Sequence, residues 1–100
     1  MTAYVVFLRE SAINDPAAMA EYRRVGAMQK PPETLTPLAV YGAIEVLEGD
    51  APDGAVILSF PSMEEASAWY HGEYQKSVKH RRAAADYRGF IVAGFDGGTG

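Results

Sequence analysis

Residues 55–66 read Ala-Val-Ile-Leu-Ser-Phe-Pro-Ser-Met-Glu-Glu-Ala and contain a strand signal followed at once by a helix start. The first six residues are mostly apolar, which is typical of a buried strand bounded by turn residues. Ser62 and Glu65 then form a Ser-x-x-Glu capping box, in which the hydroxyl and the carboxylate satisfy free backbone donors at a helix N-terminus. The sequence therefore predicts a strand over residues 55–60 and a helix that begins just after Ser62.

Downstream of this strand and helix start, the sequence predicts a second helical piece and a final strand. His71-Gly72 interrupts the first helix, and the second piece runs from there to Asp86. Residues 89–95, Gly-Phe-Ile-Val-Ala-Gly-Phe, are again short and apolar, which favours a strand.

Upstream, residues 3–9 form a first short run of β-branched and aromatic side chains, and we predict a strand there. Asn14-Asp15-Pro16 then offers a capping carboxylate followed by proline at the first helical position. This helix is predicted to end near Lys30, because Pro31-Pro32 cannot continue it.

The segment between this helix and residue 55 is interpreted as one arm of a hairpin. Residues 38–47 are largely apolar and predict a strand, with a bulge or bend at Gly42. Residues 48–54 are dense in turn formers and connect that strand to the next one.

The resulting order, strand-helix-strand-strand-helix-strand, is the split βαβ arrangement of ferredoxin-like α+β folds with a four-stranded antiparallel sheet. With 100 residues, we expect one domain over 1–96, followed by a flexible tail over 97–100. The hydrophobic content of 48% and the charged content of 22% are those of a globular chain.

The charge and the absence of particular residues exclude several classes of function. A net charge of −4 gives no basic surface for nucleic acid or for anionic membranes. There is no cysteine, so disulfides, thiolate nucleophiles and cysteine-ligated zinc are excluded. The first residues carry no basic, long apolar or cleavage-site pattern, so we expect a cytoplasmic protein.

Both faces of the predicted sheet are apolar. Along the first strand Val6 and Leu8 point to one face, whereas Val5 and Phe7 point to the other. Two helices cover only one face, so the uncovered face predicts a homodimer in which a second copy covers it. The alternative is a monomer whose open sheet is unusually apolar.

A set of short segments, in this order and spacing, resembles the family catalogued as domain of unknown function 1330. The resemblance spans nearly the whole chain and implies a dimeric α/β-barrel fold, but no established activity. Members often show Gly-Gly-Arg in the second strand, where this chain has residues 37–42, Pro-Leu-Ala-Val-Tyr-Gly, so no role of that arginine is transferred. The segments are Glu45-Val46-Leu47-Glu48-Gly49, Phe60-Pro61-Ser62-Met63-Glu64-Glu65-Ala66, Trp69-Tyr70, Glu73-Tyr74-Gln75 and Arg81.

Arg81 is the strongest candidate for a ligand contact. It matches the arginine of the family pattern, and a guanidinium offers forked donors to an anionic or enolic ligand. The simpler interpretation, which we favour from the sequence, is a structural ion pair to Glu48 or Asp86. His80 is a weaker candidate, and with His71 it makes too poor a ligand set to predict a metal.

Aromatic side chains supply the remaining candidates. Tyr22, Trp69 and Tyr74 could line an apolar pocket, although such residues more often pack in cores. Arg81 follows Tyr74 by two helical turns, so we predict that it borders a pocket together with one or more of these three. Glu48 could act as a general base if it were buried.

Two hypotheses about function follow. The protein is a barrel that binds a small apolar or anionic organic ligand between sheet and helices, with cofactor-free monooxygenase- or isomerase-like catalysis as a variant, or it is an interaction module without a ligand. No phosphate loop, dinucleotide motif or catalytic triad order is present, so we predict no cofactor.

Overall fold

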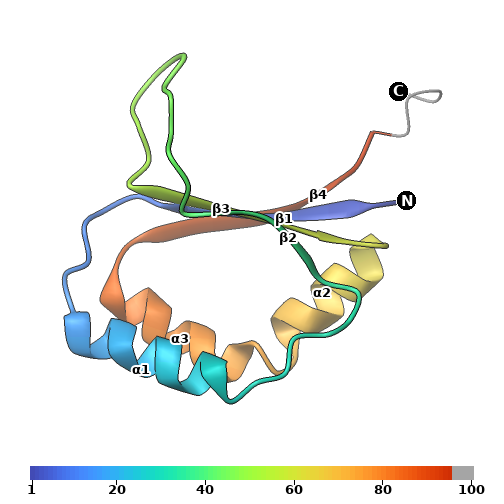
Figure 1. The fold of residues 1–100 in the computed structure, drawn as a ribbon, viewed down its shortest axis with the longest axis horizontal. Coiled ribbons are helices and arrows are strands. Elements are labelled where there is room, and N and C mark those ends of the chain that lie inside the picture. Colours follow the sequence, from blue (N-terminus) through green and yellow to red (C-terminus); the bar gives the residue numbers. More distant parts are fainter. Residues whose placement is uncertain (96–100) are drawn as a thin grey trace.

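The fold is a four-stranded antiparallel sheet with three helices on one of its faces (Figure 1). The structure, a computed structural model, describes residues 1–95, so the tail expected over 97–100 lies outside the described residues. The predicted strand-helix order is confirmed, with the last helix divided in two. In chain order the elements are β1 (Ala3–Arg9), α1 (Pro16–Ala27), β2 (Thr36–Val40), β3 (Gly54–Phe60), α2 (Met63–His71), α3 (Gln75–Ala84) and β4 (Tyr87–Ala93).

Both predicted helix starts form through the capping side chains. The Asp15 carboxylate accepts a hydrogen bond from the Ala18 backbone N–H at 3.1 Å, directly before Pro16 at the first helical position. The Ser62 hydroxyl oxygen accepts from the Glu65 N–H at 3.2 Å. Each bond satisfies a donor that a helix N-terminus leaves free.

The helix ends follow the predicted breaks closely. α2 ends at His71, and the Gly72 N–H donates to the Trp69 carbonyl oxygen at the break. α1 ends at Ala27 rather than near Lys30. Its last turn tightens there, because the backbone N–H of residue 28 bonds to the carbonyl three positions earlier, before the two prolines.

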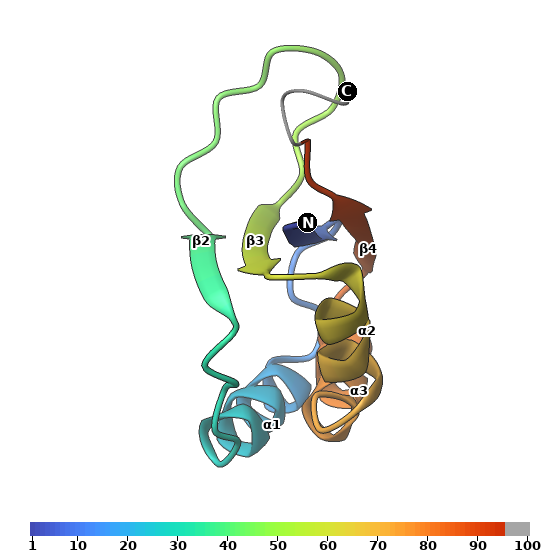
Figure 2. The same cartoon turned by 90° about the vertical axis from the view of Figure 1, so that its right-hand side faces the viewer.

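The sheet order is β2-β3-β1-β4, with β1 between its two partners (Figure 2). Val5 pairs with Leu58 of β3 and with Ile91 of β4, and these residues point toward the helices. The core lies in this layer between sheet and helices. Its buried members are Ala3, Val5, Phe7, Leu58, Phe60, Ala66, Tyr74 and Val78.

No helix covers the other sheet face within residues 1–95. Val6 pairs there with Ile57 and with Phe90, so the face that carries Val6 is the open one. Phe90 and Val92 are 46% and 47% exposed. The open face is therefore apolar, as the alternation along β1 predicts.

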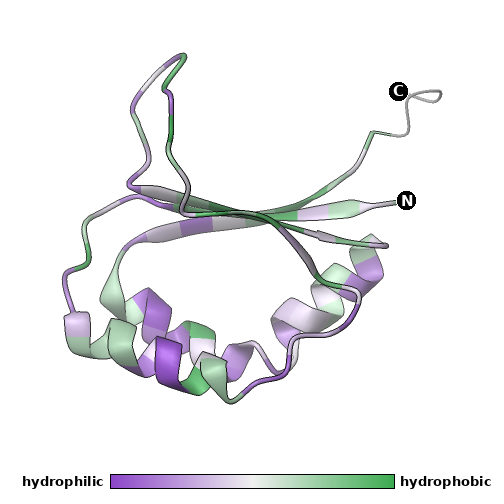
Figure 3. Ribbon diagram, viewed as in Figure 1, coloured by the Kyte–Doolittle hydropathy of each residue, from purple (hydrophilic) through white to green (hydrophobic). Residues whose placement is uncertain are grey.

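The predicted strand over residues 38–47 extends too far along the chain, whereas its antiparallel pairing with the next strand is confirmed. β2 ends at Val40, and residues 41–53 leave the sheet as a long loop, here called the arm, on the side opposite the helices (Figure 1). β3 begins only at Gly54, so a longer β2 would have to pair with the turn residues before it, where Pro52 lacks an N–H. The arm carries hydrophobic as well as hydrophilic segments, and Leu47 is 84% exposed (Figure 3).

Within residues 1–95, no helix has the length and apolar character needed to cross a membrane.

Candidate functional site

One face of α3 points a row of side chains into the space below the sheet. Tyr74, which precedes the helix, and Val78 and Arg81 along it are all buried. Arg81 Nη1 donates a hydrogen bond to the Tyr74 hydroxyl at 3.1 Å. The two-turn spacing of Tyr74 and Arg81 thus places both on one helix face.

The Arg81 guanidinium lies among aromatic rings. Its Cζ atom is 4.3 Å from the ring centroid of Phe7 on β1 and 4.3 Å from that of Tyr87 on β4. Arg81 is only 4% exposed, and its Nε has no hydrogen-bond partner in the described part of the chain. The rings offset part of the desolvation of the charge through cation–π contacts, but they do not neutralise it.

The ion pair favoured from the sequence is absent from the described residues. The salt bridges found in that part of the chain join other residues, and none involves Arg81. Glu48 is exposed on the arm, and Asp86 is exposed at the end of α3. The arm, to which Glu48 belongs, leaves the sheet on the side opposite the helices (Figure 1), whereas Arg81 is buried on the helix side.

Arg81 lines a cavity of about 410 Å³ between β4 and the two C-terminal helices, here called the Arg81 cavity. Its basic side chains are Arg81, Arg82 and His71, and no carboxylate side chain lines it. This concentration of cationic groups stands out in a chain whose net charge is −4. The other lining residues are Val5, Phe7, Tyr70, Tyr87, Gly89, Phe90 and Ile91.

Gly89 makes room for the ring under Arg81. A Cβ atom at this position would lie 2.7 Å from Cδ1 of Phe7, closer than such atoms approach in proteins. The glycine lets the Phe7 ring lie against β4, where the ring contacts the guanidinium. The Arg81 cavity thus depends on β1, β4 and α3 together.

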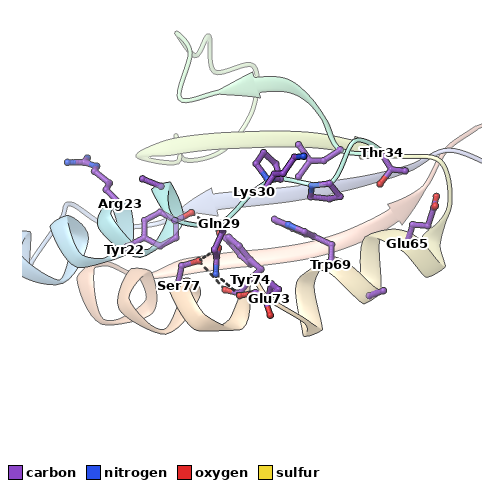
Figure 4. Close-up of a pocket in the computed structure, with 16 residues that line it drawn as sticks. Tyr22, Arg23, Gln29, Lys30, Thr34, Glu65, Trp69, Glu73, Tyr74 and Ser77 are labelled. Atoms are coloured by element: carbon purple, nitrogen blue, oxygen red, sulfur yellow. Dashed lines mark hydrogen bonds between the residues drawn. The ribbon is translucent and has the colours of Figure 1, made fainter.

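A second and larger cavity of about 780 Å³ lies on the other side of Tyr74 (Figure 4). We call it the Trp69 cleft. Its walls come from the end of α1, from the loop before β2, and from α2 and α3. Its lining residues are Tyr22, Arg23, Gly26, Ala27, Gln29, Lys30, Pro31, Pro32, Thr34, Leu35, Glu65, Ala68, Trp69, Glu73, Tyr74 and Ser77.

Three hydrogen bonds involve the uncharged polar side chains of the Trp69 cleft. The hydroxyl groups of Tyr22 and Tyr74 lie 2.8 Å apart. The hydroxyl of Ser77 donates to Gln29 Oε1 at 3.3 Å, and Gln29 Nε2 donates to the Glu73 carbonyl oxygen at 2.7 Å (Figure 4). These bonds fix the α1 end of the cleft to α3.

Burial raises the pKa of the Tyr74 phenol well above its ordinary value near 10, and the Tyr22 hydroxyl nearby raises it further. The positive charge of Arg81 acts in the opposite direction but is outweighed. Tyr74 is therefore a protonated hydrogen-bonding group at neutral pH rather than a phenolate base.

The candidates from the sequence fall into three groups. Tyr22, Trp69 and Tyr74 line the Trp69 cleft, whereas Arg81 lines the neighbouring cavity and contacts this group through Tyr74. His80 is partly buried and lines neither cavity. The pKa of Glu21 on α1 is lowered mainly by the hydrogen bond from Arg24, with a smaller contribution from His80. Glu48 on the arm lines neither cavity as well.

The sequence analysis did not place Phe7 at the site, and it missed Tyr87 because the last strand was predicted to begin at residue 89. The Tyr87 hydroxyl lies 2.7 Å from that of Tyr41 at the base of the arm. Tyr41 has a positive φ of 52°, which is rare for a residue with a side chain. The aromatic residue directly after Asp86, at the end of the helix that carries Arg81, is the signal that would have pointed to Tyr87.

In the part of the chain that the structure describes, no group of three or more His, Asp or Glu side chains could hold a metal ion.

Comparison with solved structures gives the same fold. The crystal structure of a protein of unknown function from Rhodopseudomonas palustris is 18% identical, with a TM-score of 0.58 over 95% of this chain and 83% of that one. The crystal structure of the methylated form of that protein is 20% identical, with a TM-score of 0.61 over 98% and 84%. No curated protein matches the chain. The model of the family described as "Domain of unknown function (DUF1330)" matches residues 2–95, and the chain therefore belongs to that family.

Proposed function

We propose that the protein binds a small organic acid with an apolar body in the Arg81 cavity. The observation that carries the proposal is a guanidinium that is 4% exposed and has no carboxylate partner within residues 1–95. Leaving a buried charge unpaired costs several kcal/mol. A carboxylate is the group that matches the forked donors of arginine, so a bound acid would offset this cost.

The walls of the cavity support the choice of an acid with an apolar body. Phe7, Val5 and Ile91 supply apolar surface, and Arg82 and His71 add positive or titratable groups near Arg81. A volume of about 410 Å³ is within the range of small-molecule sites. We propose binding rather than catalysis, because the group that carries the proposal, the Arg81 guanidinium, offers N–H donors to an anion and has no acceptor with which to take up a proton.

The test compares one acid with its neutral analogue. We expect 1-naphthoate to raise the melting temperature of the wild-type protein in a concentration-dependent way, and 1-naphthamide to have little effect. Arg81→Met keeps an unbranched apolar chain in place of the aliphatic part of arginine and removes the guanidinium group with its charge, so it should abolish the naphthoate shift. Arg24→Met is the matched control, since Arg24 is exposed on α1 and lines neither cavity.

The stability of the unliganded variant separates a ligand anchor from a structural arginine. We expect the free energy of unfolding of Arg81→Met to stay within about 1 kcal/mol of the wild-type value, because the removal of an unpaired buried charge offsets the loss of the contacts with Tyr74, Phe7 and Tyr87. Equal naphthoate shifts in the wild type and Arg81→Met would contradict the proposal. The proposal would also be contradicted if none of the three carboxylates 1-naphthoate, phenylacetate and decanoate changed the melting temperature of the wild-type protein.

We also propose that the protein is a homodimer in which the open sheet faces meet. The support is the apolar surface of Val6, Ile57, Phe90 and Val92, and the arm that leaves the sheet on the same side. Large contiguous apolar patches are rare on monomers, and a two-fold axis lets one such face cover its own copy.

A further inference from the structure

The Trp69 cleft is separate from the Arg81 cavity. It is almost twice as large, at about 780 Å³ against 410 Å³, and the two share no lining residue. Tyr74 stands between them, with its ring on the cleft side and its hydroxyl bonded to Arg81. The cleft therefore needs an occupant of its own, argued from its own walls.

One wall of the cleft is an aromatic stack. The rings of Trp69 and Tyr74 lie parallel within 25°, with centroids 4.3 Å apart, and Phe60 supports Trp69 from the sheet at 5.4 Å. Figure 4 shows Trp69 on the helix side of the cleft, across from Lys30 and Thr34 of the loop before β2. Pro31 and Pro32 belong to this loop, line the cleft and stiffen it. Such walls favour a flat ring system that extends the stack.

The charges of the cleft balance, in contrast to those of the Arg81 cavity. Arg23 and Lys30 contribute two positive side chains, and Glu65 and Glu73 contribute two negative ones. The polar groups deeper inside are already paired, as the Tyr22–Tyr74 hydroxyl contact and the bond from Ser77 to Gln29 show. Neither an anion nor a cation has an advantage there, and no unsatisfied buried group of the cleft demands a charged partner.

We infer that the Trp69 cleft is a second binding site, for a flat, neutral aromatic molecule that stacks beside Trp69. This site goes beyond the proposed acid-binding function and does not depend on it. The hydroxyl pair of Tyr22 and Tyr74 gives the ligand a polar contact at one end, and the prolines face the other side of the ring.

Trp69 is the only tryptophan in the chain and lines the cleft, so its fluorescence reports binding of an energy acceptor to the protein. The probe is N-phenyl-1-naphthylamine, a neutral aromatic compound that accepts energy from tryptophan. We expect saturable loss of Trp69 emission with one probe per chain. The absence of saturable quenching would overturn the inference.

Substitutions in and outside the cleft test where the probe binds. Gly26 lines the cleft on α1, and a Cβ there has no neighbour within 4 Å, so Gly26→Leu narrows the cleft without a clash and replaces a helix-interior glycine. We expect at least tenfold weaker probe binding, with an unchanged or higher melting temperature. Ala20→Leu, on the exposed side of the same helix and outside the cleft, is the control and should change the affinity less than twofold.

The remaining outcomes separate this site from the other one. Arg81→Met should bind the probe within about twofold of the wild type, since Arg81 does not line the cleft. Loss of probe binding in Arg81→Met together with wild-type binding in Gly26→Leu would place the probe in the Arg81 cavity and overturn the inference. If Gly26→Leu does not fold, Ala68→Leu narrows the cleft from α2 and carries the same expectation.

Discussion

Tyr74 connects the two cavities more closely than any other residue described. Its hydroxyl contacts the Tyr22 hydroxyl on one side and accepts from Arg81 on the other, and its ring stacks on Trp69. The residue is 9% exposed, so replacing the phenol removes two hydrogen bonds that water does not restore. We expect Tyr74→Phe to lower the free energy of unfolding by about 1–3 kcal/mol.

The raised pKa of Tyr74 also predicts a loss of stability in alkali. Below about pH 10 the phenol is protonated in both states, and its contribution to stability is complete. Above that pH the unfolded chain releases the proton while the folded chain keeps it, so stability falls, by at most about 1.4 kcal/mol per pH unit. Urea unfolding at pH 8, 10 and 11 measures the slope. A slope as steep in Tyr74→Phe as in the wild type would contradict this assignment.

For Arg81, the sequence predicted the neighbour along the same stretch of helix and missed the neighbours on the sheet. The spacing of Tyr74 and Arg81 is sufficient to place them together, because an α-helix repeats nearly every seven residues. Phe7 and Tyr87 reach Arg81 only because β1 and β4 are neighbours in the sheet. No local sequence pattern reveals that β1 and β4 are neighbours. An ion pair of Arg81 with Glu48 or Asp86 was therefore the simpler interpretation of the sequence.

The Arg81 cavity requires close packing of β1 against β4. Gly89 on β4 faces the Phe7 ring at a distance that leaves no room for a methyl group. We expect Gly89→Ala to lower the free energy of unfolding by about 1–3 kcal/mol, the usual cost of overpacking. It should also weaken binding of 1-naphthoate, because the displaced Phe7 ring lines the same cavity.

Gly42→Ala is the matched control for this substitution, since a Cβ at Gly42 meets nothing within 4 Å. Thermal unfolding of the two variants beside the wild type gives the comparison. Equal melting temperatures for Gly89→Ala and Gly42→Ala would show that the Phe7 ring shifts at no cost.

The elements that the sequence predicted well begin or end at residues that cap or break a helix through contacts with their own neighbours in the chain. The Ser62 capping box and the Asp15 cap give the starts of two helices, and His71-Gly72 gives the break between α2 and α3. The arm was misread as a strand because residues 43–47 are apolar enough for one. Pairing partners, rather than composition, determine where β2 ends.

For the whole molecule the open sheet face predicts self-association. Val92→Lys places a charge where a second copy would pack, and the side chain is already 47% exposed, so the fold of one chain should persist. We expect light scattering to report a dimer for the wild type and a monomer for Val92→Lys. Met28→Lys, at a 74% exposed apolar residue on the helix side, should remain dimeric.

Ile57→Asp is the stronger variant of this test, because Ile57 lies opposite Val6 in the middle of the open face. A carboxylate there should dissociate the dimer or unfold the chain. A wild-type protein that is monomeric at micromolar concentration would favour the unusually apolar open sheet instead.

The central place of β1 also determines how the chain must fold. Ala3 pairs with Phe60 on one side and with Ala93 on the other, so the first strand cannot form its pairs until the second half of the sequence is present. Closing such long loops costs entropy before any pairing compensates for it, and folds with distant contacts reach the native state in milliseconds to seconds. During synthesis at roughly 5–20 residues per second, the apolar first strand remains without β4 for several seconds. The growing chain is thus most exposed to aggregation before its last strand is made.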